Sequence, residues 1–153
     1  MTTKPYKRHK ALQPLSRDHH HGLLLSWKIK SGFSKNISVE RIKAYADWFY
    51  ENHLIPHFEI EEAEIFAILG TNNELVKQAI DDHKRLKHLF TEEINTKKAL
   101  YDIEEELEQH IRFEERILFP EIQKNATEAQ LRHIENIHHP ASFEENTTDV
   151  FWK

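Results

Sequence analysis

Two stretches of the sequence place a histidine and a pair of glutamates at helical spacing. HFEIEEAEIF begins at His57, and HIRFEERILF begins at His110. In each copy the His stands four residues before a Glu-Glu pair and nine residues before a Phe. Residues i and i+4 lie on one face of an α-helix. Each stretch can therefore direct an imidazole and a carboxylate at one point, His57 with Glu61 and His110 with Glu114, as a metal site requires.

The composition restricts the metals that such a site could hold. The chain has no cysteine, which excludes disulfides, thiolate zinc sites and iron–sulfur clusters. It has 12 histidines among 153 residues, an unusual number that calls for a reason. Imidazole and carboxylate ligands suit iron, manganese or zinc.

Length and charge narrow the class of protein. A chain of 153 residues is expected to form one domain. Its net charge of -5 gives no reason to expect binding to nucleic acid or to an anionic membrane. The first 15 residues are polar and basic without an apolar run, so they predict neither a secretory signal nor a membrane span. A cytoplasmic location is the resulting expectation.

Hydrophobic periodicity predicts the elements that position these residues. Four long amphipathic helices and a short fifth are expected over Pro14–Ser31, Val39–Leu69, Glu74–Thr96, Ala99–Lys124 and Thr127–Ile137. Ser38 is the expected N-cap of the second helix, and Thr127 and Gln130 have capping-box spacing. Pro56 lies inside the second helix and predicts a kink just before His57, although it could also divide two separate helices.

Four long helices joined by short loops predict an all-α fold, an up-down-up-down four-helix bundle. The bundle should span residues 14–124, after an N-terminal arm of residues 1–13. Residues 125–153 should form the short fifth helix, ended by His138-His139-Pro140, and a C-terminal tail whose aromatic residues could dock on the bundle. In such a bundle, inward polar side chains at similar depth converge on one core site.

Each long helix carries one histidine on its predicted inner face. The six candidate metal ligands are His20, His57, Glu61, His83, His110 and Glu114. One metal ion would take His20 and His57, the other would take His83 and His110, and the two glutamates would bridge both. Ionised carboxylates in a core are costly unless they are paired or metal-bound, which favours a metal site over a metal-free core.

The first helix offers more than one histidine. His20 is preferred because Leu23, Leu24 and Trp27 share its predicted face, and His19 is the alternative. His53, one turn before His57 on the same face, could support the site or guard its entrance. The glutamates Glu59, Glu62 and Glu115 are expected to face solvent or to support the ligands, and Glu62 and Glu115 could also serve as alternative bridges. The histidines expected to be solvated or capping are His9, His88, His133, His138 and His139.

These motifs resemble the hemerythrin-like domains of the HHE cation-binding family. The residues that carry the resemblance are Asp18-His19-His20, His57 to Glu62, Asp82 to Leu86 and His110 to Glu115. The resemblance covers residues 14–124 and implies a four-helix bundle with a carboxylate-bridged di-iron centre and an open coordination position. It implies two iron ions (Fe2+/Fe3+) with an oxo or hydroxo bridge as an option, and zinc or manganese as possible substitutes.

The sequence also departs from the oxygen-carrying hemerythrins. Those carriers place a second His four residues after the third-helix His, where this chain has Lys87. They place an Asp five residues after the fourth-helix His, where this chain has Glu115. A site with six ligands rather than seven would leave one metal more open. Reactivity with oxygen, peroxide or nitric oxide, or simple metal binding, is therefore expected as readily as oxygen carriage.

Three functions from different classes remain open. The leading expectation is a non-haem di-iron protein that binds or senses a small diatomic ligand, peroxide or iron itself, with no protein partner identified. The second is a di-iron oxidoreductase, namely a peroxidase, an oxidase or a nitric oxide reductase. Ferritin-like di-iron enzymes use Glu-x-x-His, and no candidate His has a Glu three residues before it. The third is a metal-free helical interaction module.

Overall fold

The computed structural model describes residues 7–137 and 143–153, and the described residues contain helices but no β-strand. The predicted all-α fold class is confirmed. The separate helices are α1 (Gln13–Ser34), α4 (Glu74–Phe90) and α7 (Glu128–Ile137). Two longer helical runs contain wider or tighter turns. The first joins α2 (Val39–Phe49), a π-turn (Tyr50–Leu54), α3 (Ile55–Ile60), a π-turn (Glu61–Ile65) and a 3-10 turn (Phe66–Ile68); the second joins α5 (Thr96–Phe113), a π-turn (Glu114–Leu118) and α6 (Phe119–Asn125).

Local capping signals in the sequence explain where several helices begin. The Ser38 side chain accepts a hydrogen bond from the backbone N–H of Arg41 at the start of α2. Thr127 and Gln130 form the predicted capping box: each side chain accepts a hydrogen bond from the backbone N–H of the other, at 3.1 and 2.8 Å. Both predicted caps are confirmed.

Pro56 does not divide the second helical run. A π-turn directly precedes it, in which the backbone N–H of Ile55 donates to the carbonyl of Tyr50, five residues earlier. Proline lacks an N–H and its ring clashes with the carbonyl four residues before it, and a wider turn relieves this crowding while the helix continues. Pro120 follows the π-turn of the other run in the same way. The alternative of two separate helices at Pro56 is wrong.

Two predicted helix ends are wrong. The third helix ends at Phe90 rather than Thr96, and the next begins at Thr96. Ile94, which falls within the predicted third helix, lies in the loop and is 89% exposed. The first helix continues past Ser31 to Ser34 and includes the buried Gly32, where an added Cβ atom would lie against Ile42 and Phe151.

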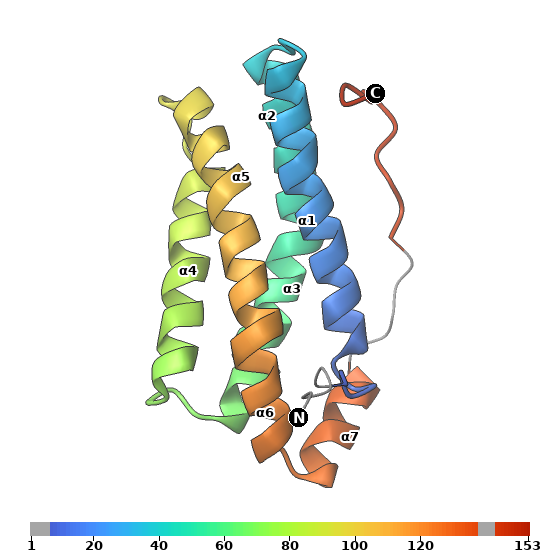
Figure 1. Ribbon diagram of the computed structural model, residues 1–153, viewed down its shortest axis with the longest axis vertical. Helices are drawn as coiled ribbons and strands as arrows, with labels where there is room; N and C mark the ends of the chain where they lie inside the picture. Colours follow the sequence, from blue (N-terminus) through green and yellow to red (C-terminus); the bar gives the residue numbers. More distant parts are fainter. Residues whose placement is uncertain (1–6, 138–142) are drawn as a thin grey trace, which may run out of the picture.

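The helices pack lengthwise around an interior that is apolar at both ends. α1 packs along α5, and α5 packs along α4 (Figure 1). One apolar cluster contains Leu25 and Ile111, and the other contains Leu15 and Leu118. Along α1, buried His19 therefore lies between two apolar clusters. The other helical runs also carry buried polar residues at the level of His19. The buried polar layer between the clusters consists of His19, His57, Glu61, His83, His110 and Glu114.

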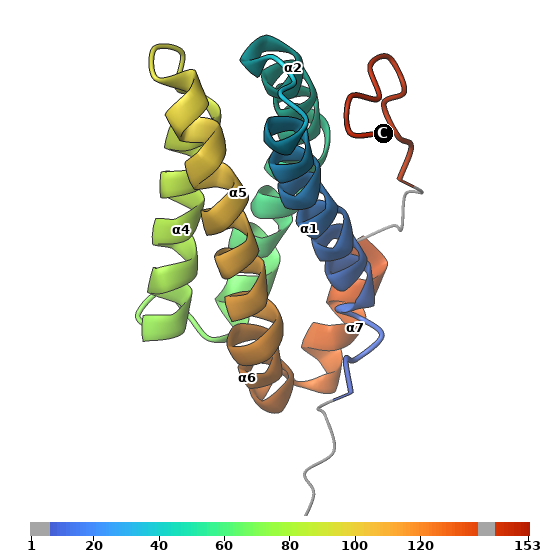
Figure 2. The ribbon, with the colours of Figure 1, turned by 45° about the horizontal axis from the view of Figure 1, so that its top comes forward.

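The chain ends dock on this body. Residues 143–153 run beside α1 and α2 (Figure 2), with Phe151 and Trp152 buried in the core as the tail prediction allowed. The predicted arm is docked where it is described, since Arg8 donates a hydrogen bond to the backbone carbonyl of Glu115. Residues 1–6 of the arm, and the predicted helix end at residues 138–140, lie outside the described residues. Among the described helices, none has the length and apolarity to cross a membrane.

Candidate metal centre

Six buried side chains from four helical segments meet in the polar layer. They form two overlapping groups, each compact enough to hold a metal ion: His19, His57, Glu61 and Glu114 in the first, and Glu61, His83, His110 and Glu114 in the second. All six are at most 4% exposed. The two glutamates belong to both groups.

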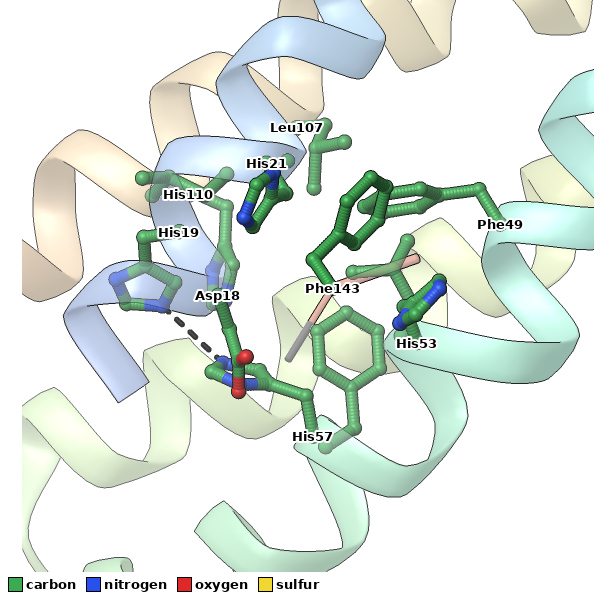
Figure 3. A pocket seen from close by; sticks show the side chains of 13 residues that line it. Asp18, His19, His21, Phe49, His53, His57, Leu107, His110 and Phe143 are labelled. Carbon is green, nitrogen blue, oxygen red and sulfur yellow. Dashed lines mark hydrogen bonds and ion pairs between the residues drawn. The ribbon is translucent and has the colours of Figure 1, made fainter. Parts of the chain in front are cut away.

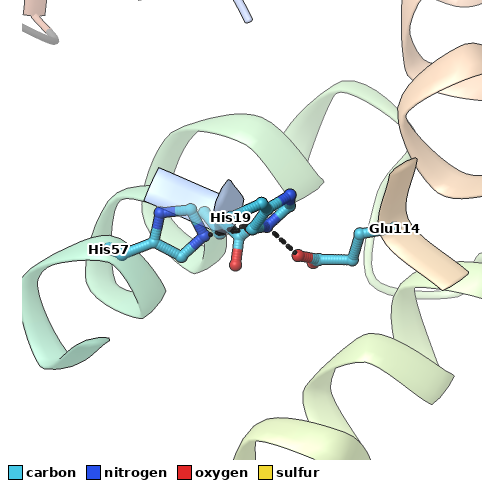
Figure 4. A group of neighbouring side chains, drawn as sticks. His19, His57 and Glu114 are labelled. Carbon is cyan, nitrogen blue, oxygen red and sulfur yellow. Dashed lines mark hydrogen bonds and ion pairs between the residues drawn. The ribbon is translucent and has the colours of Figure 1, made fainter. Parts of the chain in front are cut away.

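The first group centres on the Nε2 atoms of His19 and His57, which lie 3.2 Å apart. Glu114 Oε1 lies 2.9 Å from His19 Nε2 (Figure 4). Glu61 Oε2 lies 3.3 Å from His57 Nε2. Two nitrogens bound to one ion at about 2.1 Å, with tetrahedral to octahedral angles, stand roughly 3.0–3.4 Å apart. The nitrogen separation therefore matches that of two ligands of one cation.

The second group repeats this arrangement around the same two carboxylates. His83 Nε2 lies 3.2 Å from Glu61 Oε1 and 4.0 Å from Glu114 Oε2. His110 Nε2 lies 3.4 Å from Glu114 Oε1. Glu61 thus presents one oxygen to each group, as a bridging carboxylate would.

A further carboxylate holds the outer nitrogen of each histidine. The Nδ1 atoms of His19, His57, His83 and His110 lie 2.7, 2.9, 2.7 and 2.9 Å from Glu115, Asp18, Glu62 and Asp82 respectively. An ionised carboxylate only accepts hydrogen bonds, so each Nδ1 carries the donated hydrogen. In a neutral imidazole the Nε2 lone pair then remains free and points into the cluster. This carboxylate–histidine pairing orients metal-binding histidines and increases their basicity.

The four pairs follow a two-fold pattern in the sequence. Asp18 and Asp82 each precede a cluster histidine and hold the histidine of another helix. Glu62 and Glu115 each follow a shared glutamate and hold the histidine that comes after one of these aspartates. In each Glu-Glu pair, the first glutamate therefore faces the cluster and the second orients a histidine. The option that Glu62 and Glu115 bridge the metals is not supported, since neither belongs to a compact group.

Several inward-facing atoms have no hydrogen-bond partner. They are both carboxylate oxygens of Glu61, Oε2 of Glu114, and the Nε2 atoms of His83 and His110. Buried polar groups are normally satisfied, and each exception requires a physical explanation. With every Nδ1 hydrogen committed elsewhere, these atoms are acceptors that face other acceptors when the histidines are neutral. A cation between them would satisfy all of them, so the residues fit a metal.

The electrostatics of the cluster favour charge inside the core. Burial lowers the pKa of His57, but the charge of Glu61 and the hydrogen bond to Asp18 outweigh it and raise that pKa to about 9. Burial likewise lowers the pKa of His110, while Glu114 and Asp82 raise it to about 10. Burial raises the pKa of Glu61, yet the surrounding histidines hold it well below its usual value. The carboxylates thus attract positive charge, supplied by protons or by metal.

The Phe nine residues after each motif histidine packs on a histidine from another helix. The ring of Phe119 stacks on His19 with centroids 5.2 Å apart, and that of Phe66 lies 5.6 Å from His83. Phe58 also stacks on His83, with centroids 3.9 Å apart. These aromatic residues restrict access of water to the cluster.

The structure places His19, and not the predicted His20, in the cluster. His20 is exposed, and His19 occupies the place predicted for it. The face chosen for His20 included Trp27, which is 53% exposed. The buried face of α1 instead runs through Leu15, His19 and Ile29. The other five predicted residues meet in the cluster, in the expected pairs.

A repeated dipeptide in the sequence identifies His19, although the periodicity of apolar residues did not. Asp18-His19 repeats the dipeptide Asp82-His83, and both aspartates orient a histidine. Aligning the halves on this dipeptide selects His19. His53 is half-buried and lies outside both compact groups, but it lines a cavity beside them.

Comparison with protein-family models, curated proteins and solved structures finds no match. The function is therefore inferred from the geometry of the buried cluster.

Proposed function

We propose that this chain is a non-haem di-iron binding protein of hemerythrin-like type, in which two iron ions share Glu61 and Glu114. One ion would take the histidines of the group containing His19, and the other those of the group containing His83. The observation that carries the proposal is the set of buried acceptors without hydrogen-bond partners, arranged in two groups around shared carboxylates. A metal-free core would leave these groups unsatisfied unless the histidines took up protons.

The proposed architecture is an up-down-up-down four-helix bundle over residues 14–124, with residues 1–13 as an arm and residues 125–153 as a short helix and tail. The lengthwise packing of α1, α5 and α4 supports it. So does the polar layer, since four helical segments each contribute a histidine at one level.

Iron and a small ligand are proposed from the donor set and the resemblance together. Imidazole and carboxylate donors suit iron, and they would also accept zinc or manganese. Six protein side chains cannot fill the coordination of two iron ions, so positions remain for a small molecule such as oxygen, nitric oxide or peroxide. Lys87, which stands where oxygen carriers have a histidine, is exposed and outside both groups. This supports an open centre.

When bound, an iron pair would supply reversible ligand binding or electron transfer to that molecule. The chain's own contribution is to orient and shield. Asp18 and Asp82 fix the imidazoles of His57 and His110, and the phenylalanine rings exclude water from the cluster. Carboxylates at the outer nitrogens also make the histidines stronger donors.

Metal analysis after reconstitution with Fe(II) tests the proposal. We expect close to two iron ions per chain and near-ultraviolet bands of a bridged ferric pair after exposure to air. Glu61→Ala should lower the iron content, whereas His20→Ala, which changes an exposed histidine of the same helix, should not. An iron content well below one per chain, unchanged by reconstitution, would contradict the proposal.

A di-iron oxidoreductase is the second candidate. The observation that favours it is a cavity beside the cluster, lined in part by His57 and His110, in which a substrate could approach the metals. Stopped-flow mixing of the reduced protein with oxygen or peroxide separates the two functions. Multiple turnovers indicate an enzyme, and a stable adduct indicates a binding protein or sensor.

A metal-free interaction module is the third candidate, and the unpartnered buried acceptors oppose it. Replacing His110 with Ala distinguishes it from a metalloprotein. If the chain binds metal, this variant should lose at least one ion and unfold at a lower temperature, because metal binding is linked to folding. Unchanged metal content and spectrum would favour the interaction module.

A further inference from the structure

A small cavity lies against the candidate metal cluster. His57 and His110 border it on the cluster side, and Leu107, Ile111 and Phe143 contribute apolar walls (Figure 3). The centre of a water molecule has about 20 Å³ of room in it, and one water needs roughly 10–15 Å³ by this measure. The cavity therefore fits one molecule of two or three heavy atoms.

Residue 22 limits this space from the α1 side. A Cβ atom at Gly22 would lie 2.6 Å from Cδ1 of Ile111, so α1 and α5 approach closely beside the cavity. Asp18 and several histidines form the polar part of the lining, and Leu107, Ile111 and Phe143 belong to the apolar part. An ionic ligand against the apolar part would bury an unpaired charge, which is costly, and a small uncharged molecule avoids this cost.

The remaining wall comes from the C-terminal tail. The ring of Phe143 stacks on His21 of α1, with centroids 3.9 Å apart and planes at 11°. It also lies 4.7 Å from the ring of His53 on the facing helical run. All three rings line the cavity. Phe143 thus spans the distance between two helices and covers the cavity there.

The tail is anchored close to Phe143. Two residues later, Glu145 accepts hydrogen bonds from the buried Lys28 Nζ, at 2.5 Å, and from the Tyr45 hydroxyl. Lys28 Nζ also lies 4.1 Å from the ring centroid of the buried Trp152. These contacts attach the tail to α1 and α2, and so restrict where the Phe143 ring can go.

A second anchor lies further along the tail. Arg41 donates two hydrogen bonds to Asp149, at 2.8 and 2.7 Å. Phe151 is buried against Gly32, where a Cβ atom would lie 2.8 Å from its ring. Residues 143–153 therefore form a strap whose far end is part of the core and whose near end is the half-buried Phe143.

We propose that Phe143, held by this strap, controls access of a small uncharged molecule to the cavity beside the cluster, and with His21 and His53 limits its size. The proposal rests on the proposed metal-binding function only for the claim that a molecule inside the cavity reaches a metal ion. Access itself is a property of the aromatic contacts and the cavity. Displacement of the Phe143 ring opens the cavity, and its return closes it.

Dissolved oxygen tests this access without requiring iron. Its paramagnetism accelerates relaxation of methyl groups that it reaches, so the methyls of Leu107 and Ile111 report on the cavity in NMR spectra. The measurement uses protein loaded with zinc, or metal-free protein if no zinc binds. Phe143→Ala should increase the oxygen effect at these methyls by about two- to tenfold, as expected for loss of an aromatic pair that holds the cavity closed. Trp27→Ala, an exposed aromatic on α1, is the matched control and should leave the effect unchanged.

A second variant separates access from loss of the ring. Glu145→Gln keeps Phe143 but weakens its anchor, and it should increase the oxygen effect in the same direction by a smaller factor. This variant decides the question if Phe143→Ala does not fold. An unchanged oxygen effect in the folded variants, or an equal increase in Trp27→Ala, would overturn the proposal.

The iron-loaded protein provides the companion measurement. Phe143→Ala should increase the rate of nitric oxide binding to the reduced protein, and should increase the rate for the bulkier ethyl isocyanide by a larger factor. A chain that takes up no iron but shows the oxygen effect would refute the metal function and retain the access role. A chain that binds iron, with rates and oxygen effect unaffected by Phe143→Ala, would refute the access role alone.

Discussion

The metal affinities of three variants test the assignment of His19 as a ligand. Two variants change histidines of α1, and the third changes the carboxylate that pairs with one of them. His19→Ala removes a nitrogen that lies 3.2 Å from Nε2 of His57. His20→Ala removes the neighbouring, exposed imidazole. Glu115→Ala leaves His19 in place but removes the carboxylate 2.7 Å from its Nδ1. The three changes therefore separate a ligand, its orienting partner and an adjacent histidine outside the cluster.

The structure sets the order and size of the expected effects. Loss of an orienting carboxylate typically weakens metal binding about 10- to 100-fold, or roughly 1.4–2.7 kcal/mol. Glu115→Ala should fall in this range, and His19→Ala should exceed it because the donor atom itself is lost. For a domain of this size, 1 kcal/mol corresponds to about 2–4 °C in Tm. Glu115→Ala should therefore reduce the metal-induced rise in Tm by roughly 3–11 °C.

Competition with a chromophoric chelator measures the affinities, and thermal unfolding with and without metal measures the rise in Tm. Comparing the rise, rather than Tm itself, removes the effect of Arg8 losing its partner in Glu115→Ala. We expect affinity to decrease in the order wild type, Glu115→Ala, His19→Ala, with His20→Ala equal to wild type. An affinity loss in His20→Ala as large as that in His19→Ala would refute the assignment, and so would an unaffected Glu115→Ala.

Three further outcomes follow from the same structure. Glu114→Ala should weaken binding of both ions because Glu114 belongs to both groups, whereas His83→Ala should weaken only one; titrations with equal losses in the two variants would contradict a shared carboxylate. In protein stripped of metal, stability should decrease from about pH 6.5 to 10, since His57 and His110, with pKa values of about 9 and about 10, hold protons that unfolded histidines release near pH 6.5. The slope should approach about 1.4 kcal/mol per pH unit per histidine in urea unfolding, and a flat or rising profile would count against the paired cluster. Gly32→Ala should lower stability by about 1–3 kcal/mol through overpacking in the core, partly offset by about 1 kcal/mol of helix propensity, and a higher Tm would show that the tail does not pack there.

Much of the cluster could be predicted because its spacing is local. The i, i+4 relation of His57 to Glu61 and of His110 to Glu114 depends only on helix geometry, and both pairs meet as expected. The capping box at Thr127 is equally local. Such features survive folding because neighbouring residues in a helix cannot change their relative positions greatly.

The errors arose where the outcome depends on the packing of distant segments. His20 was preferred because Leu23, Leu24 and Trp27 share its predicted face, but none of these three residues is fully buried. The core side of α1 instead carries small residues such as Gly22, where α5 approaches closely. Helix periodicity alone cannot decide between adjacent residues when the buried stripe includes glycine and serine.

The roles of Asp18 and Asp82 as orienting carboxylates, and the aromatic cover supplied by the tail, were also beyond the reach of periodicity, whereas support by Glu62 and Glu115 was among the expectations. Asp18 binds a histidine 39 positions away, and Phe143 reaches the cavity from the tail. Neither contact has a sequence spacing that predicts it. Only the repeated Asp-His dipeptide at Asp18 and Asp82 offered an indirect signal.

The central claim is that one cluster holds two metal ions bridged by Glu61 and Glu114. X-ray absorption at the iron edge of reconstituted protein tests it most directly, since neighbouring irons scatter one another's photoelectrons. The proposed di-iron function predicts an iron–iron separation below about 4 Å, as in other two-metal sites, together with nitrogen and oxygen neighbours. Iron bound with nitrogen and oxygen neighbours but no iron within that distance, at any loading, would contradict the claim.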